Sequence, residues 1–341
     1  MSEAKPSYFY LNLLRCVATI AVIIIHVLGP MRELYGQIPV SEWLATVTYN
    51  SATRWAVPVF MMISGALLLS DKRPFDCRYY LSRRLMKVLI PFLAWTVIYS
   101  LITGYSGDGW SSAVAADTLI AANNTPVWYH LWFFYDFIPL YFVIPLLIPV
   151  LRVMTREQVK LLIAAWLFLT SIFMLKIETA IAQNIVLYSG YLILGWFLHN
   201  RDNSKELKYW VIAGLSWIVI DIIGTWAIAQ QTHEYSGFFM GYKTINTVLI
   251  GGMIFVLCQH FAPRLEQRFA APVNTVGKYS LGIYLIHPIL LIPVRQLDNG
   301  FYAWFGTDWL AISAISVVTL MVALALTWLL AKVPVVNRLL P

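Results

Sequence analysis

The stretch FYLNLLRCVATIAVIIIHVL, residues 9–28, decides the fold class, because it is apolar along nearly its whole length. A helix needs about 20 mostly apolar residues to cross the hydrocarbon core of a bilayer. Runs of the same kind recur at roughly residues 51–69, 85–104, 129–151, 161–180, 184–199, 209–229, 240–261, 278–296 and 309–331. We therefore predict an all-α, polytopic bundle of about ten transmembrane helices, with an error of about one helix.

The composition agrees with a membrane protein and bounds the domain organisation. Of the 341 residues, 60% are hydrophobic and 12% are charged, whereas a soluble domain carries about 25% charged residues. We find no Gly/Ser-rich linker and no low-complexity tract, so we predict that residues 1–341 form a single integral-membrane domain. Cys16, Cys77 and Cys258 lack the spacing of a metal site or a disulfide framework, and we expect neither.

The basic residues between the apolar runs predict the orientation of the chain. Cytoplasmic N- and C-termini place most Lys and Arg residues on the cytoplasmic side, as the positive-inside rule requires. The same bias explains the formal net charge of +7, so the charge does not indicate a nucleic-acid partner. Arg15 lies within the first helix, and the other exceptions are Arg32, Arg54, Lys176, Lys243 and Arg295.

Two ionisable residues share one face of the first predicted helix. Arg15 and His26 are eleven residues apart, and eleven steps of about 100° return to within about 20° of the same face. They lie about 16 Å apart along the axis, with Arg15 near the cytoplasmic end. A charge in hydrocarbon costs about 2.5–3.5 kcal/mol, so each such group needs a reason. Two explanations fit the pair equally well. The residues either have a functional role, or they are a snorkelling arginine and a histidine that is hydrogen-bonded in the core.

A basic trio, Arg83, Arg84 and Lys87, stands where the third predicted helix begins, and positions 83 and 87 share a face. The positive-inside rule alone explains basic residues at this place. The trio also suits phosphate groups, which guanidinium groups bind bidentately. In the preceding helix, Pro58 and the pair Ser64-Gly65 either open backbone groups to a cavity or allow close helix packing.

Further polar residues lie in or beside later apolar runs. Each alone is better explained as a satisfied polar group than as a catalyst. Together they indicate a polar interior that a purely structural bundle would not need. These residues are His130, Asp136, Asp221, Tyr279, Tyr284 and His287. Aromatic pairs such as Trp128-Tyr129 fit an interfacial belt instead.

Several of these residues together resemble membrane-bound acyltransferase family 3. The family pattern has an Arg, ten residues and a His in the first helix, which here are Arg15 and His26. Asn12 stands where most members carry Asp, so it can orient a partner only through hydrogen bonds. Asn12 and the segment His130-Leu131-Trp132-Phe133 are similar to the subgroup that acetylates bacterial surface polysaccharides such as the enterobacterial common antigen. The remaining matches, in family order, are Phe60–Gly65, the basic trio and Ser280–His287.

The resemblance implies an O-acetyltransferase of the bacterial inner membrane with acetyl-CoA as its donor and no metal. The implied acceptor is a hydroxyl of a surface or exopolysaccharide, or of its lipid-linked precursor, on the periplasmic side. His26 and Arg15 are the expected catalytic residues, and the basic trio would bind the CoA. Whether His26 acts as a general base or carries the acetyl group covalently stays open, as does a homo-oligomer. Supporting roles are expected for Asn12, Ser64, His130, Trp132, Tyr284 and His287.

A proton-coupled transporter, or an exporter of polysaccharide or lipid, is the main competing function. Asp136, Asp221 and a Pro-containing helix also suit a carrier. The sequence has no clear internal repeat of hydropathy or motif, which weighs against this class. A membrane scaffold without chemistry is disfavoured because polar residues line up on one helix face.

Overall fold

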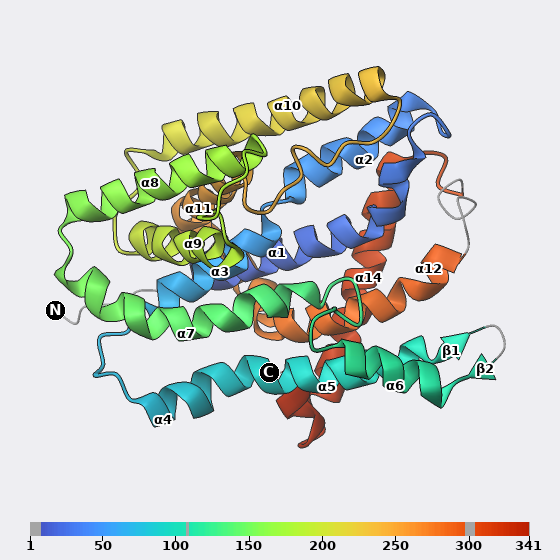
Figure 1. The fold of residues 1–341 in the computed structure, drawn as a ribbon, viewed down its shortest axis with the longest axis horizontal. Helices are drawn as coiled ribbons and strands as arrows, with labels where there is room; N and C mark the ends of the chain where they lie inside the picture. Colours follow the sequence, from blue (N-terminus) through green and yellow to red (C-terminus); the bar gives the residue numbers. More distant parts are fainter. Residues whose placement is uncertain (1–7, 107–108, 297–303, 341) are drawn as a thin grey trace.

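The structure is a computed structural model that describes residues 8–106, 109–296 and 304–340. Figure 1 shows a bundle of long helices with α1 (Phe9–Val27) running through its middle. The next elements are η1 (Gly29–Leu34), α2 (Val40–Thr53), α3 (Ala56–Leu68), α4 (Cys77–Tyr80), η2 (Leu81–Leu85) and α5 (Met86–Thr103). A short antiparallel pair, β1 (Tyr105–Ser106) and β2 (Gly109–Trp110), precedes α6 (Ser112–Ala121). The second half contains α7 (Trp132–Val153), α8 (Arg156–Met174), α9 (Asn184–His199), α10 (Leu207–Thr232), α11 (Ile245–Leu290), α12 (Ile292–Gln296), α14 (Asp308–Leu330) and η3 (Val336–Leu339).

The predicted all-helical membrane fold is confirmed. Within the described residues, eight helical segments are long and apolar enough to cross a membrane. α9 coincides with the run predicted at 184–199 and is apolar, but it is only 16 residues long. The spanning segments are α1, joined α2–α3, α4 through α5, α7, α8, α10, α11 through α12, and α14.

α11 differs most from the prediction. It covers 46 residues and takes in most of the two runs predicted at 240–261 and 278–296. Only Phe269 departs from helical backbone angles, with φ −123° and ψ 16°, and two helices meet there at a kink. The sequence between the runs is polar, which suggested a loop, but Arg and Glu side chains are good helix formers. The polar connection is therefore helical.

The helix predicted at 51–69 also begins earlier, at Val40, and its two parts meet at Arg54-Trp55. Pro58 lies in the first turn of α3, where its missing N–H costs no helical hydrogen bond. A Cβ atom at Gly65 would lie 2.0 Å from the backbone oxygen of Leu192, and one at Gly195 would lie 2.1 Å from that of Met62. Glycines thus let α3 and α9 pack backbone against backbone.

α1 is the central helix, since it packs against α11, α3, α14 and α2. Leu11, Leu14 and Ala18 on this helix are almost fully buried, and they belong to the large apolar cluster of the bundle. Arg15 and His26 are only partly buried. The packed faces of α1 therefore fix the position of the stripe that carries these two residues.

Candidate active site

Two histidines that are distant in sequence lie in contact near one end of α1. A hydrogen bond of 2.6 Å joins His26 Nδ1 to His287 Nε2 of α11. The rings lie side by side and nearly in one plane, with centroids 4.9 Å apart and an interplanar angle of 6°. His287 is fully buried, whereas His26 is partly exposed. The sequence indicated both residues separately, and the fold brings them together.

A third partner decides which nitrogen of each ring carries the proton. His287 Nδ1 lies 3.1 Å from the backbone oxygen of Ile283, which can only accept a hydrogen bond. In the neutral ring, Nδ1 of His287 therefore donates, and its Nε2 accepts from the Nδ1–H of His26. The remaining nitrogen of His26, Nε2, then keeps its lone pair. That lone pair can act as a general base or as a nucleophile.

His130 adds a third imidazole from the segment before α7. It is fully buried, and its ring centroid lies 6.0 Å from that of His287 and 5.3 Å from that of Tyr284. The Tyr284 hydroxyl donates to the backbone oxygen of His130, which ties this segment to α11. Neither ring nitrogen of His130 has a hydrogen-bond partner among the residues that the structure describes. Since buried polar groups are usually paired, this ring stands out.

Two residues beside the histidines were missed as site residues by the sequence analysis. The Tyr129 ring meets the His26 ring edge-on, with centroids 5.0 Å apart. Arg295 Nη2 donates to the backbone oxygen of His26 at 3.1 Å, and its guanidinium lies 4.2 Å from the Tyr129 ring centre. Tyr129 had been assigned to the interfacial belt. The available signal was Arg295, one of the few basic residues that broke the topology rule.

A basic cavity of about 370 Å³ opens along the same helix, toward Arg15. All three members of the basic trio line it together with Arg15 and Lys278, which the sequence did not indicate as a site residue. None of the lining residues is acidic. Tyr284 lines the cavity and also contacts His130, so it connects the cavity to the histidines. The cavity reaches Val22, one helical turn before His26.

Two members of the trio, Arg83 and Arg84, enter the cavity from an irregular helix turn. Leu81–Leu85, which includes Arg83 and Arg84, forms η2, a π-helical turn between α4 and α5. A π turn is wider than an α turn, and such turns are frequent at functional sites. The sequence predicted a regular helix entry here, because no residue pattern marks a π turn. The trio itself was indicated by its charge.

Asn12 orients Arg15 at the cavity wall. Arg15 Nη1 donates to Asn12 Oδ1 at 2.9 Å, and Asn12 Nδ2 donates to Asn274 Oδ1 at 2.8 Å. The chain of amides therefore links α1 to α11 without a carboxylate. Asn12 therefore contacts Arg15 through a hydrogen bond and not through an ion pair.

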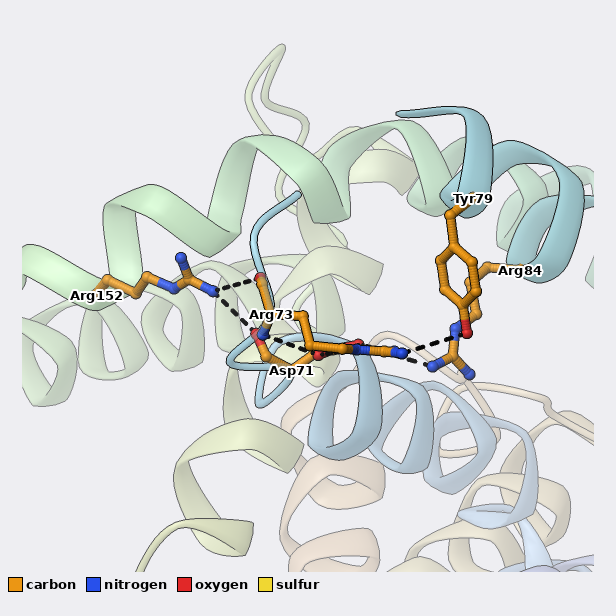
Figure 2. Close-up of polar contacts among 5 residues, drawn as sticks. All are labelled: Asp71, Arg73, Tyr79, Arg84 and Arg152. Atoms are coloured by element: carbon orange, nitrogen blue, oxygen red, sulfur yellow. Dashed lines mark hydrogen bonds and ion pairs between the residues drawn. The ribbon is translucent and has the colours of Figure 1, made fainter. Parts of the chain in front are cut away.

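A loop beside the cavity carries the acidic residue closest to the trio. Figure 2 shows Asp71 bonded to Arg73, with Arg84 Nη2 3.7 Å from Asp71 Oδ2. The hydrogen bonds from Arg73 are the main reason that the pKa of Asp71 falls to about 2. Arg152 fastens the loop by donating to the backbone oxygens of Asp71 and Arg73, at 2.9 and 3.3 Å. A second hollow of about 250 Å³ lies between this loop and Tyr79, and it shares Arg84 with the basic cavity.

The other polar residues indicated by the sequence lie apart from the histidines. Ser64 lines the cavity, but its hydroxyl donates to the Phe60 backbone oxygen at 3.0 Å. Trp132 stacks on Tyr242, with centroids 5.1 Å apart, and does not line the cavity. Asp136 accepts a hydrogen bond from Asn184, and buried Asp221 accepts one from Asn246. Each aspartate thus has an amide partner, although Oδ1 of Asp221 has no hydrogen-bond partner among the described residues.

Comparison with known families adds one finding to this geometry. A family model described as an acyltransferase domain matches residues 8–328, nearly the whole chain. No curated protein and no solved structure matched the chain.

Within the described residues, no group of three His, Cys, Asp or Glu side chains is placed to hold a metal ion.

Proposed function

The chain belongs to acyltransferase family 3 and is a transferase, and from that premise we propose that it moves an acetyl group from acetyl-CoA to a sugar hydroxyl across a bacterial inner membrane. The acceptor would be a surface or exopolysaccharide, or its lipid-linked precursor. The observation that carries the proposal is the arrangement along α1: a basic cavity at Arg15 and a histidine with a free lone pair at His26.

Acetyl-CoA suits the cavity by charge. Its nucleotide end carries phosphates, and five cationic side chains without an acidic one line the cavity. Apolar residues such as Val57 and Ile63 on the same walls suit the uncharged pantetheine arm. Phe75 and Tyr79 in the adjoining hollow offer aromatic surfaces to an adenine ring. We therefore expect the nucleotide to lie at the basic end of the cavity, with the arm following α1 toward His26.

The histidine pair suits a direct transfer. His26 Nε2 would take the proton from the acceptor hydroxyl as its oxygen attacks the thioester carbonyl carbon. The carbon–sulfur bond then breaks, the CoA thiolate leaves, and the proton passes from His26 to that thiolate. His287 holds the reactive tautomer of His26 through the 2.6 Å hydrogen bond. The hydrogen-bonded pair thus supplies a base that is neutral before the reaction and cationic after proton transfer.

A covalent route uses the same lone pair. His26 Nε2 would attack the thioester itself, release CoA and pass the acetyl group on in a second step. Incubation of the purified protein with labelled acetyl-CoA and no acceptor distinguishes the routes. Label that stays on His26 supports the covalent route, and its absence under conditions of turnover supports direct transfer.

The proposal is tested by replacing His26. In a deletion strain, the wild-type gene should restore acetyl esters on the surface glycan, measured by mass spectrometry, and His26→Ala should not. The purified variant should transfer acetyl at least about 100-fold more slowly, because general acid–base catalysis contributes about 10²–10⁴-fold. His260→Ala is the matched control, since His260 is an exposed histidine on α11 outside the cluster. Normal acetylation by an equally abundant His26→Ala protein would refute the proposal.

A further inference from the structure

Three arginines lie around the His26 end of the bundle, and we call them the arginine triad: Arg32, Arg54 and Arg295. Arg32 belongs to η1, which follows α1 directly. Arg54 stands one helical turn before Val57, and His26 stands one helical turn beyond Val22. Val22 and Val57 both line the basic cavity, so Arg54 and His26 each lie one turn from a residue of its wall. Arg295 donates a hydrogen bond to the backbone oxygen of His26. The triad therefore flanks the reactive histidine on the side away from the basic cavity.

Each arginine of the triad is held in place without a carboxylate. The guanidinium nitrogens donate to backbone oxygens: Arg32 to Gly29 at 3.2 Å, Arg54 to Met240 at 2.6 Å and Arg295 to His26 at 3.1 Å. Each guanidinium also lies near a tyrosine ring, at 6.0 Å from Tyr235, 4.3 Å from Tyr242 and 4.2 Å from Tyr129, respectively. Such contacts orient a guanidinium group but leave its charge uncompensated.

The few ion pairs in the described residues lie elsewhere in the chain. Within the described segments, the arginines that form ion pairs are Arg73 and Arg84 with Asp71, and Arg201 with Glu206. Among the residues that the structure describes, no carboxylate forms an ion pair with an arginine of the triad. Glu33 follows Arg32 directly, but it is exposed. Arg32 and Arg54 are partly buried, and a partly buried charge is favoured by an anionic partner.

Topology does not explain the triad either. If the basic cavity faces the cytoplasm, the triad lies on the opposite side, where the positive-inside rule disfavours arginine. A functional reason is therefore needed for three arginines at this end. Guanidinium groups match phosphate and carboxylate groups through paired N–H donors.

We propose that the arginine triad binds an anionic group of the acceptor and thereby places the acceptor hydroxyl at His26. The inference rests on the proposed acetyl transfer and names the acceptor class as anionic. The anionic group is either the phosphate of a lipid-linked sugar or the carboxylate of an acidic sugar. Both present the same pair of oxygens to a guanidinium group.

The acceptor can be tested without knowing its identity. Unacetylated glycan and glycolipid are extracted from the deletion strain, incubated with purified protein and radiolabelled acetyl-CoA, and separated on an anion exchanger. The label should elute with anionic material, and label confined to neutral material would overturn the inference. Chemical reduction of the carboxyl groups in the extract before the assay distinguishes the two sources of the anionic group. Loss of labelling then identifies a sugar carboxylate, and retained labelling of anionic material identifies a phosphate. A failure of the proposed function looks different, because no fraction would then be labelled at all.

Variants test the residues themselves. Arg54→Gln combined with Arg295→Gln should raise the KM for the extracted acceptor at least about tenfold, the loss expected for charge-assisted hydrogen bonds. Binding of acetyl-CoA, measured by titration calorimetry, should stay unchanged, which also reports that the variant is folded. Lys176→Gln removes one exposed charge in the loop after α8 and should leave the KM unchanged. An unchanged acceptor KM in the double variant would overturn the inference.

Discussion

At the scale of single residues, the site depends on which histidine nitrogen carries a proton. The carbonyl of Ile283 selects the tautomer of His287, and His287 in turn selects that of His26. A buried residue thus controls the lone pair that would react with the acceptor. Asn12 has a similar indirect role toward Arg15, since its amide holds the guanidinium at the cavity wall.

His287→Ala should slow acetyl transfer at least about tenfold, because a histidine in the wrong tautomer is a poor base and costs up to about 10⁴-fold in serine proteases. His287→Gln should recover part of the rate, since its side-chain oxygen can accept from His26 Nδ1–H. Rates are measured at saturating acetyl-CoA. Equal rates for the two variants would contradict a role in selecting the tautomer.

Asp71→Asn should strengthen the binding of acetyl-CoA by a factor between about 1.4 and 5 at low salt. The Asp71 carboxylate lies 3.7 Å from Arg84, and an exposed charge interaction of this kind is worth about 0.2–1 kcal/mol. Titration calorimetry measures the effect, which high salt should remove. Asp202→Asn, in the exposed loop after α9, is the control. Weaker binding by Asp71→Asn would show instead that Asp71 positions the loop.

The folded-state pKa of Asp71, about 2, also fixes the pH range of this interaction. Because the pKa is depressed in the folded state, the ion pair contributes its full stabilisation at pH values above the ordinary aspartate pKa of about 4. This stabilisation is lost as the pH falls toward 2. Between roughly pH 5 and pH 9 the Asp71 carboxylate therefore stays ionised. Over this range, the affinity for acetyl-CoA should change with pH in the same way in the wild type and in Asp71→Asn.

At the scale of elements, two local features place the site: the π turn of η2 and the close pair α3–α9. The π turn carries Arg83 and Arg84 of the basic trio into the cavity. The α3–α9 contact fixes the helix that bears Phe60 and Ser64 on the opposite wall. The cavity therefore depends on how helices meet as much as on which residues line it.

Gly65→Ala should lower the thermal stability of the detergent-solubilised protein, by about 1–3 kcal/mol for an overpacked contact. The added Cβ would lie 2.0 Å from the backbone oxygen of Leu192, and backbone atoms cannot move aside as a flexible side chain can. Gly237→Ala is the control, because nothing lies within 4 Å of a Cβ there. Thermal unfolding followed by fluorescence-detected size exclusion measures both, and an equal shift for the two would contradict the packing argument.

At the scale of the whole molecule, α1 connects two sites of different chemistry. The basic cavity lies toward its first residues, and the histidines with the arginine triad lie near its last. Under the proposed function, this arrangement would let donor and acceptor approach from opposite sides of the membrane. The orientation predicted from the loop charges would place the donor in the cytoplasm.

Cys77 can report that orientation without any substitution. It is exposed at the start of α4, whereas Cys16 and Cys258 are buried. A membrane-impermeant maleimide should label Cys77 in inverted membrane vesicles and leave it unlabelled in intact spheroplasts. Cys77→Ser, which should take up no label, is the control. Labelling in intact spheroplasts alone would reverse the orientation and with it the assignment of donor and acceptor sides.

The sequence by itself determined the membrane fold, the positions of most helices and the places of Arg15 and His26 along the first helix. Those features follow from local rules: the bilayer selects apolar segments of a set length, and one helix has a fixed rise per residue. Only the tertiary structure decided that His287, 261 residues from His26, would be its partner, and that Arg295 would lie beside it. Contacts between distant segments depend on how helix surfaces pack, including glycine contacts, a kink at Phe269 and a π turn, and none of these has a spacing that can be read along the chain.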